Sequence, residues 1–233
     1  MYNVAMDSQL CMIRDAYDLT VRQYHANIDP LASVPEDFVR SEPFQAFQKT
    51  MAACGASSGA PENQRFLAPS VGMKFLDAGC CANLASYRLD RWPSLYYGVD
   101  ISPALIEAMR GFAAQENIHI GALEVAELVE LPFDDSFFDI AAVVGVLEYA
   151  DLEYCHRALR ELRRVLKHRG RLVVDIPNMA HKHVDVMLQL EAYLGRPIVV
   201  KSRHDFEALL PSLFRTVAVD ESQVMLKYFV EAA

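Results

Sequence analysis

The sequence predicts an α/β fold, in which a doubly wound, mostly parallel sheet is covered by helices on both faces. Short apolar runs alternate with amphipathic helical segments between residues 73 and 177. The run at 137–146, FFDIAAVVGV, is almost wholly apolar, as expected of a strand covered on both sides. Two more strand-like segments end the chain with no helix between them, which predicts a closing antiparallel hairpin.

Periodicity and helix-start signals place the individual elements. Residues 8–27 carry apolar side chains at spacings of three and four, which predicts an amphipathic helix. Ser102 followed by Pro103 is typical of a helix start. Helices are expected at 8–27, 42–54, 102–116, 151–167, 182–194 and 204–210, and strands at 73–78, 94–100, 118–125, 137–146, 170–177, 214–221 and 223–232.

The chain divides into an N-terminal helical cap with a linker, residues 1–70, and a main domain, residues 71–233. The segment 55–64, GASSGAPENQ, is rich in Gly, Ser and Pro and is expected to form a loop or linker. The full length of 233 residues suits one sizeable α/β domain with a small appendage.

Charge and composition narrow the possible partners. A net charge of −9 lacks the basic footprint of a nucleic-acid binder, and no apolar run is long enough to span a membrane. The five cysteines are irregularly spaced, which argues against a zinc or other metal site and suits a reduced, cytoplasmic protein. A homodimer is compatible with the sequence.

Acidic residues and glycines follow the predicted strands, where ligands bind in folds of this kind. Gly79, two residues after Asp77, permits a tight turn, and Asp100 after the second strand can accept both hydroxyls of a ribose. After the third strand, Glu127 and Leu128 can meet the exocyclic amine of an adenine. After the fourth come Gly145, Glu148 and Tyr149, which are placed to border the reacting end of the ligand.

Residues 73–177 resemble the core of class I S-adenosylmethionine-dependent methyltransferases, in the group that acts on small molecules. FLDAGC and YYGVDIS carry part of the resemblance. The most specific part is the segment ELPFDDSFFDIAAVVGVLEYADLEYCHRALRELRRVLKHRGRLVVDIPN, and the closing hairpin also fits. YDLTVRQYH, residues 17–25, resembles the helix that lies over the cofactor in several subfamilies. The resemblance implies a seven-stranded Rossmann-like methyltransferase fold.

The same resemblance implies S-adenosylmethionine as the cofactor and a small-molecule methyl acceptor. It assigns Asp100 to the ribose, and Gly145 to close passage of the chain past the methionine moiety. The remaining implied cofactor contacts are Asp77 and Gly79 at the methionine end and its turn, Ile101 on adenine, Glu127 and Leu128 at the adenine edge, and Tyr17 and Tyr24 closing the pocket from the cap.

The cofactor loop GCCANL departs from the family pattern, which usually has glycines at the positions of Cys81 and Asn83. Cysteine is small, and Asn tolerates unusual backbone angles, so a working loop is favoured over a decayed one. A thiol at a helix N-terminus is expected to have a lowered pKa, which leaves redox or metal chemistry at Cys80 and Cys81 as a minor alternative.

Methyl transfer needs a base only when the acceptor must lose a proton. Candidates are Glu148 and Tyr149, at positions where related sequences often carry histidines, and His181 in the segment after the fifth strand. The first rival function is a methyltransferase-like protein that binds the cofactor or a partner without methyl transfer. A nicotinamide-dependent oxidoreductase is disfavoured because GCCANL does not match G-x-G-x-x-G. Aminopropyl transfer is disfavoured because no acidic pair follows the fourth strand.

Overall fold

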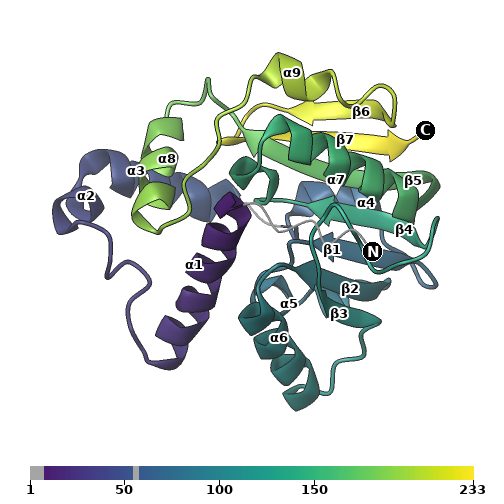
Figure 1. The fold of residues 1–233 in the computed structure, drawn as a ribbon, viewed down its shortest axis with the longest axis horizontal. Coiled ribbons are helices and arrows are strands. Elements are labelled where there is room, and N and C mark those ends of the chain that lie inside the picture. Colours follow the sequence, from purple (N-terminus) through teal and green to yellow (C-terminus); the bar gives the residue numbers. More distant parts are fainter. Residues whose placement is uncertain (1–7, 55–57) are drawn as a thin grey trace.

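The computed structural model describes residues 8–54 and 58–233 and centres on one seven-stranded sheet (Figure 1). The strands are β1 Lys74–Ala78, β2 Leu95–Asp100, β3 Ala122–Val125, β4 Phe138–Val143, β5 Leu166–Pro177, β6 Phe214–Asp220 and β7 Met225–Ala232. Their order across the sheet is β3-β2-β1-β4-β5-β7-β6. β7 runs antiparallel to β5 and β6, and the other neighbouring strands are parallel. The predicted doubly wound sheet with its antiparallel hairpin is confirmed.

Helices cover both faces of this sheet and extend beyond one end of it (Figure 1). They are α1 Ser8–His25, α2 Glu36–Arg40, α3 Glu42–Cys54, α4 Pro61–Leu67, α5 Asn83–Tyr87, α6 Pro103–Gln115, α7 Leu152–Val165, α8 Val184–Tyr193 and α9 Arg203–Glu207, with the 3₁₀ turns η1 Leu89–Arg91 and η2 Leu147–Tyr149. The helices predicted at 42–54 and 102–116 form with nearly those bounds, and the Ser102 hydroxyl caps α6 by accepting from the backbone N–H of Leu105.

The core lies in two layers, one on each face of the sheet. Successive strand residues point to opposite faces, so Leu76 packs with α7 and α9, while Phe75 packs with α4, α5 and α6. The α7 and α9 layer includes Leu159 and Phe206, and the opposite layer includes Ile106. Burying each such side chain contributes about 1.5–3 kcal/mol, so both layers hold the strand ends in fixed positions.

The N-terminal helices lie over the sheet's carboxyl edge and beside α8. Phe44 and Phe47 of α3 pack with Val184 and Met187 of α8 in a small separate cluster. α1 is tied to the start of α6, because Asp18 accepts hydrogen bonds from the Ser102 hydroxyl and from the backbone N–H of Ala104. This contact holds α1 across the loops that follow β1 and β2.

Several element boundaries differ from the sequence prediction. Of the expected loop at 55–64, residues 61–64 belong to α4, because Pro61 takes the first helical position, a start that the Gly- and Ser-rich composition hid. Residues 55–57 lie outside the described residues. β3 begins only at Ala122, since Gly121 lies directly against the ring of Tyr97. β5 starts at Leu166, immediately after α7, and the four residues that follow form an irregular stretch before its pairing with β4 resumes at Arg171.

The division at residue 70 stays a prediction. The segment before it contacts the sheet, because Glu62 of α4 forms an ion pair with the buried Lys227 of β7, with 2.5 Å between the carboxylate oxygen and Nζ. Across residues 8–54 and 58–233, no helix combines the length and the apolar composition needed to cross a membrane.

Candidate functional site

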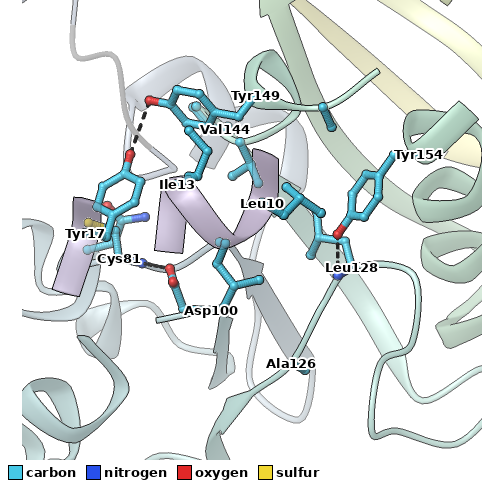
Figure 2. Close-up of a pocket in the computed structure, with 16 residues that line it drawn as sticks. Leu10, Ile13, Tyr17, Cys81, Asp100, Ala126, Leu128, Val144, Tyr149 and Tyr154 are labelled. Carbon is cyan, nitrogen blue, oxygen red and sulfur yellow. Dashed lines mark hydrogen bonds between the residues drawn. The ribbon is translucent and has the colours of Figure 1, made fainter. Parts of the chain in front are cut away.

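A cavity that opens to solvent lies at the carboxyl ends of β1, β2 and β4 (Figure 2). The strand order reverses between β1 and β4, so the loops after these strands diverge and leave a crevice there. Leu10, Ile13 and Tyr17 of α1 form one wall of the cavity. The remaining lining residues are Gly79, Cys81, Asn83, Asp100, Ile101, Ala126, Leu128, Val144, Gly145, Val146, Tyr149, Ala150 and Tyr154.

The loop after β1 requires glycine at its first position. Gly79 has φ +77°, and an added Cβ would lie 2.3 Å from a Cγ atom of Val146. The backbone N–H groups of Gly79 and Cys80 both donate to the carbonyl oxygen of Val99, at 2.8 Å. The turn is therefore fixed to β2, and its backbone lies close to the loop that follows β4.

Cys81 takes a left-handed backbone conformation, with φ +43°, which a side chain disfavours. Its N–H donates to Asp100 Oδ2 at 2.9 Å, and its side chain lines the cavity. Cys80 is fully buried, with Sγ packed toward Gly98 of β2. Burial raises the pKa of the Cys81 thiol to about 11 and that of Cys80 well above its usual value. The expected lowering of a thiol pKa at this helix start is therefore wrong, and both cysteines stay as neutral thiols.

Asp77 lies beneath the loop instead of facing the cavity. Its carboxylate accepts hydrogen bonds from the hydroxyls of Ser58 and Tyr96, at 2.6 and 2.9 Å, and from the Asn83 side-chain amide at 3.1 Å. Burial raises the pKa of Asp77, and these three donors oppose that rise. Asp77 thus holds together the start of α5, the edge of α4 and β2, while Asn83 carries the contact up to the cavity wall.

Asp100 is the one charged side chain among the described residues that line the cavity. Oδ2 accepts from the Cys81 N–H and Oδ1 from the Ser102 N–H, each at 2.9 Å. An ionised carboxylate offers about four lone-pair sites, so two remain for a ligand. Burial raises the pKa of Asp100 to about 6, helped by the negative charges of Asp77 and Asp18 and opposed by the two N–H donors.

The part of the cavity beyond Asp100 is lined mostly by apolar side chains. Ile101, Ala126 and Leu128 line it, and the Tyr154 hydroxyl accepts a hydrogen bond from the Leu128 N–H at 3.3 Å (Figure 2). Glu127, expected at the adenine edge, is not among the residues that line the cavity. The apolar walls and the backbone at 126–128 suit a planar, weakly polar ring.

Beyond β4, the chain turns at Gly145, which has φ +72° and donates its N–H to Asp175 Oδ1 at 2.9 Å. Glu148 is buried behind this turn and does not line the cavity. Its Oε2 has no hydrogen-bond partner among the described residues. Burial and the neighbouring Asp175 raise the pKa of Glu148 well above its usual value.

Tyr149 does face the cavity, and it joins a hydrogen-bonded group of four side chains. Its hydroxyl lies 3.3 Å from that of Tyr17 and donates to Glu191 Oε2 at 3.0 Å. Arg196 donates to the same carboxylate through Nε at 2.8 Å, and its guanidinium lies 4.6 Å from the Tyr17 ring centroid. This group links α1, η2, α8 and the segment after α8.

Two predicted site residues lie elsewhere. Tyr24 is near the end of α1, where its side chain is 75% exposed and contacts the ring of His25. His181 lines a separate, shallow depression formed by the segment after β5 and the residues around Lys201 and Arg203. Neither side chain is brought to the cavity.

The sequence reading missed several residues of the site. Leu10 and Ile13 had been placed on the apolar stripe of the first helix, which could equally have packed on the core. Tyr154 lies on the first turn of α7, where its ring faces the cavity. Glu191 and Arg196 follow no local pattern that marks a site, and only the fold brings them to Tyr149.

Comparison with known proteins agrees with this geometry. Residues 76–174 match a family model described as a methyltransferase domain. Over this segment, about two fifths of its length, the chain is similar to the methyltransferase domain of that family. The predicted family resemblance and fold are thus confirmed, and the matched segment of the methyltransferase domain runs from β1 into β5, across the loops that form the cavity.

Two curated relatives and one solved structure illustrate the similarity. A ubiquinone/menaquinone biosynthesis C-methyltransferase from Citrifermentans bemidjiense is 36% identical over 80 residues, covering 33% of this chain and 32% of that protein. A malonyl-[acyl-carrier protein] O-methyltransferase from Herminiimonas arsenicoxydans is 36% identical over 122 residues, covering 52% of this chain and 41% of that protein. The chain therefore spans less than half the length of these relatives.

The solved structure is a geranyl diphosphate C-methyltransferase from Streptomyces coelicolor, crystallised with Mg²⁺, geranyl diphosphate and S-adenosyl-L-homocysteine. It superposes with a TM-score of 0.67 at 16% identity, over 98% of this chain and 99% of that one. At this identity the likeness concerns the fold, and it includes the N-terminal helices as well as the methyltransferase domain.

Proposed function

We propose that the protein is an enzyme that transfers a methyl group from S-adenosylmethionine to a small-molecule acceptor. The observation that carries the proposal is the Asp100 carboxylate, which faces a cavity at the strand switch point with two acceptor sites uncommitted. The matched methyltransferase domain and the geranyl diphosphate bound by the structurally similar enzyme support the same function.

The residues of the cavity fit the cofactor from end to end. Gly79 and Gly145 leave no side chain where the two loops approach each other, and their positive φ angles keep the backbone close to the cavity. Asp100 would bind the ribose hydroxyls, and Ile101 and Leu128 would hold the adenine between apolar walls. When bound, S-adenosylmethionine supplies a methyl group already activated as a sulfonium, ready for in-line displacement.

The chain's own contribution is then to orient the reactants and to exclude water. α1 covers the cavity with Leu10 and Ile13, and Asp18 holds α1 in place on α6. Of the three expected catalytic residues, Tyr149 is the one whose side chain lines the cavity, which favours it for contact with the acceptor. Glu148 would act from behind the Gly145 turn, as a support for that turn.

A second candidate is a methyltransferase-like protein that binds the cofactor without transferring its methyl group. Cys81 motivates it, because the family usually has a glycine where this side chain stands in a left-handed conformation and lines the cavity. A loop narrowed by the Cys81 side chain would still bind the nucleoside part of the cofactor, but it would displace the methyl-bearing end.

The test is transfer of label from methyl-labelled S-adenosylmethionine to a panel of small molecules with hydroxyl, amine, thiol and activated carbon acceptors. Asp100→Asn serves as the matched control, with folding checked by circular dichroism. Label in an acceptor with the parent protein, and at least tenfold less with the variant at limiting cofactor, supports the enzyme. Tight binding of the cofactor with no label in any acceptor class favours the non-catalytic alternative.

A further inference from the structure

The cavity has one polar end whose hydroxyl groups are not needed to bind the ribose or the adenine, although the family resemblance places one of its residues, Tyr17, over the cofactor. It consists of the hydroxyls of Tyr17 and Tyr149, which come from α1 and η2 and lie 3.3 Å apart (Figure 2). Around them, Ile13 and Val146 contribute apolar surface. A molecule that shares the cavity with the cofactor would therefore find its polar contact at these two hydroxyls.

Glu191 and Arg196 fix how the two hydroxyls are oriented. The Glu191 carboxylate accepts two hydrogen bonds from Arg196, one from Nε at 2.8 Å and one from Nη2 at 3.2 Å. The Arg196 side chain is 14% exposed and that of Glu191 is 15% exposed. The same carboxylate accepts from the Tyr149 hydroxyl at 3.0 Å. Paired with a guanidinium, this carboxylate can only accept, so the hydroxyl proton of Tyr149 must point toward Glu191.

The orientation of Tyr149 decides that of Tyr17. Each phenol has one proton, and the Tyr149 proton is committed to Glu191, so Tyr17 is the donor in the contact between the two hydroxyls. Burial raises the pKa of both phenols, so both remain protonated at neutral pH. The oxygens still have free lone pairs, but neither hydroxyl has a proton left to offer. The pair can accept a hydrogen bond from a ligand and cannot donate one.

The charges around the two tyrosine hydroxyls further restrict which ligands can bind there. No Lys, Arg or His side chain is among the described residues that line the cavity, and Arg196 is already engaged by Glu191 and stacked on Tyr17. A carboxylate or phosphate brought to this end would meet Asp100 and Glu191 with no free cation from residues 8–54 or 58–233, and burying such an unpaired charge is strongly unfavourable.

We propose that the Tyr17–Tyr149 pair is the recognition point for the methyl acceptor, and that the acceptor is a neutral, largely apolar molecule that presents a hydroxyl or N–H group as a hydrogen-bond donor. The inference rests on the proposed function. Tyr17 and Tyr149 contact the acceptor, whereas Glu191 and Arg196 are positioning residues that act through Tyr149.

Three matched probes test the donor requirement by equilibrium binding to protein saturated with S-adenosylhomocysteine. 4-Propylphenol can donate, 4-propylanisole has the donor capped by a methyl group, and 4-propylbenzoate carries a negative charge. We expect the phenol to bind about tenfold more tightly than the anisole and the benzoate, as one well-placed hydrogen bond allows.

Tyr149→Phe tests whether the pair causes the preference, because it keeps the ring and removes the oriented oxygen. Its expected preference for the phenol over the anisole falls to within twofold, while its affinity for S-adenosylhomocysteine stays within threefold of the parent. Glu191→Gln should also reduce the preference, because an amide can donate to Tyr149 and free its proton. Tyr193→Phe, on the same helix as Glu191 but 42% exposed, is the control and should keep the full preference.

The outcomes separate this inference from the proposed function. Failure of S-adenosylhomocysteine to bind the folded parent protein overturns the proposed function and the inference with it. If the cofactor product binds but the anisole or benzoate binds as well as the phenol, or if no probe binds at millimolar concentration, the acceptor inference alone is wrong. It is also wrong if Tyr149→Phe retains the parent's preference.

Discussion

Asp100 allows the cofactor site to be tested through pH as well as through mutation. Its carboxylate is almost fully buried, and burial raises its pKa from 3.8 to about 6. A ribose offers two hydroxyl donors, which bind the ionised carboxylate much better than the protonated one. Protonation of Asp100 in the free protein should therefore compete with cofactor binding in an accessible pH range.

The magnitude follows from the pKa. A group with a pKa of about 6 is roughly nine-tenths ionised at about pH 7 and roughly one-tenth ionised at about pH 5. If only the ionised form binds, affinity for S-adenosylhomocysteine falls about tenfold between these two values. Asp100→Asn removes the charge from both hydroxyl contacts, at about 1.5–3 kcal/mol for each, so binding should weaken by tenfold or more and lose this pH dependence.

The pH dependence of folding stability that Asp100 causes has the opposite sign to the pH dependence of cofactor binding. The folded pKa lies above the ordinary value, so the stabilisation linked to Asp100 is fully present below about pH 4 and is lost as the pH rises through about 6. The unliganded protein should thus lose stability over the range in which its affinity for the cofactor rises.

The assay is isothermal titration calorimetry with S-adenosylhomocysteine at several pH values between about 5 and 7.5, on the parent and on Asp100→Asn. Asp175, whose pKa burial raises to about 7, titrates in the same window and is present in both proteins. A pH dependence that survives in the variant would assign the effect to Asp175 or another group. Equal affinities of parent and variant at pH 7 would remove Asp100 from the ribose role.

Three further substitutions test the loop and the scaffold. Gly79→Ala should destabilise the fold by about 2–3 kcal/mol in chemical denaturation, because Gly79 has a positive φ and an added Cβ would overlap the side chain of Val146. The control is Gly111→Ala in α6, where an added Cβ has open space, so it should be neutral or stabilising by up to about 1 kcal/mol. Cys81→Gly should bind S-adenosylhomocysteine at least as tightly as the parent, since it relieves a left-handed residue; tenfold weaker binding would mean that the thiol itself contacts the ligand. Lys227→Ala should lower the free energy of unfolding by about 3–5 kcal/mol, because it removes a buried charge that pairs with Glu62; a loss below 1 kcal/mol would show that solvent reaches the pair.

The sequence predicted the sheet, and the positions of Asp100 and Gly79 at its carboxyl edge, because both depend on local pattern. Asp100 follows a short apolar strand, and Gly79 follows another, so the rule that ligands bind at the carboxyl edge was enough to place them together. The almost wholly apolar run of β4 likewise marked a strand buried on both faces, which the two-layered core confirms.

Local sequence patterns could not show in which direction a side chain points, or which residues far apart in the chain come into contact. The pattern placed Asp77 at a strand end, but it could not show that its carboxylate turns down to Ser58 and Tyr96 and away from the cavity. Glu148 and Tyr149 are neighbours in the chain, yet the 3₁₀ turn buries one and directs the other to the cavity.

The acceptor end of the cavity is the part of the site that the sequence predicts least. Tyr17 and Tyr149 are 132 positions apart, and Arg196 comes from a segment that has no regular secondary structure. Their contact depends on how α1 and α8 pack on the sheet, and no spacing in the sequence encodes it. The helix start at Pro61 was hidden for a different reason, because Gly and Ser before it gave a loop-like composition.

The altered GCCAN loop should still form a working cofactor site. Calorimetric titration of the purified, reduced protein with S-adenosylmethionine and, separately, with S-adenosylhomocysteine tests this. We expect micromolar binding of both at one site per chain. No heat of binding, with a protein shown to be folded and free of retained ligand, would contradict it and would identify Cys81 as the residue that closes the loop to the cofactor.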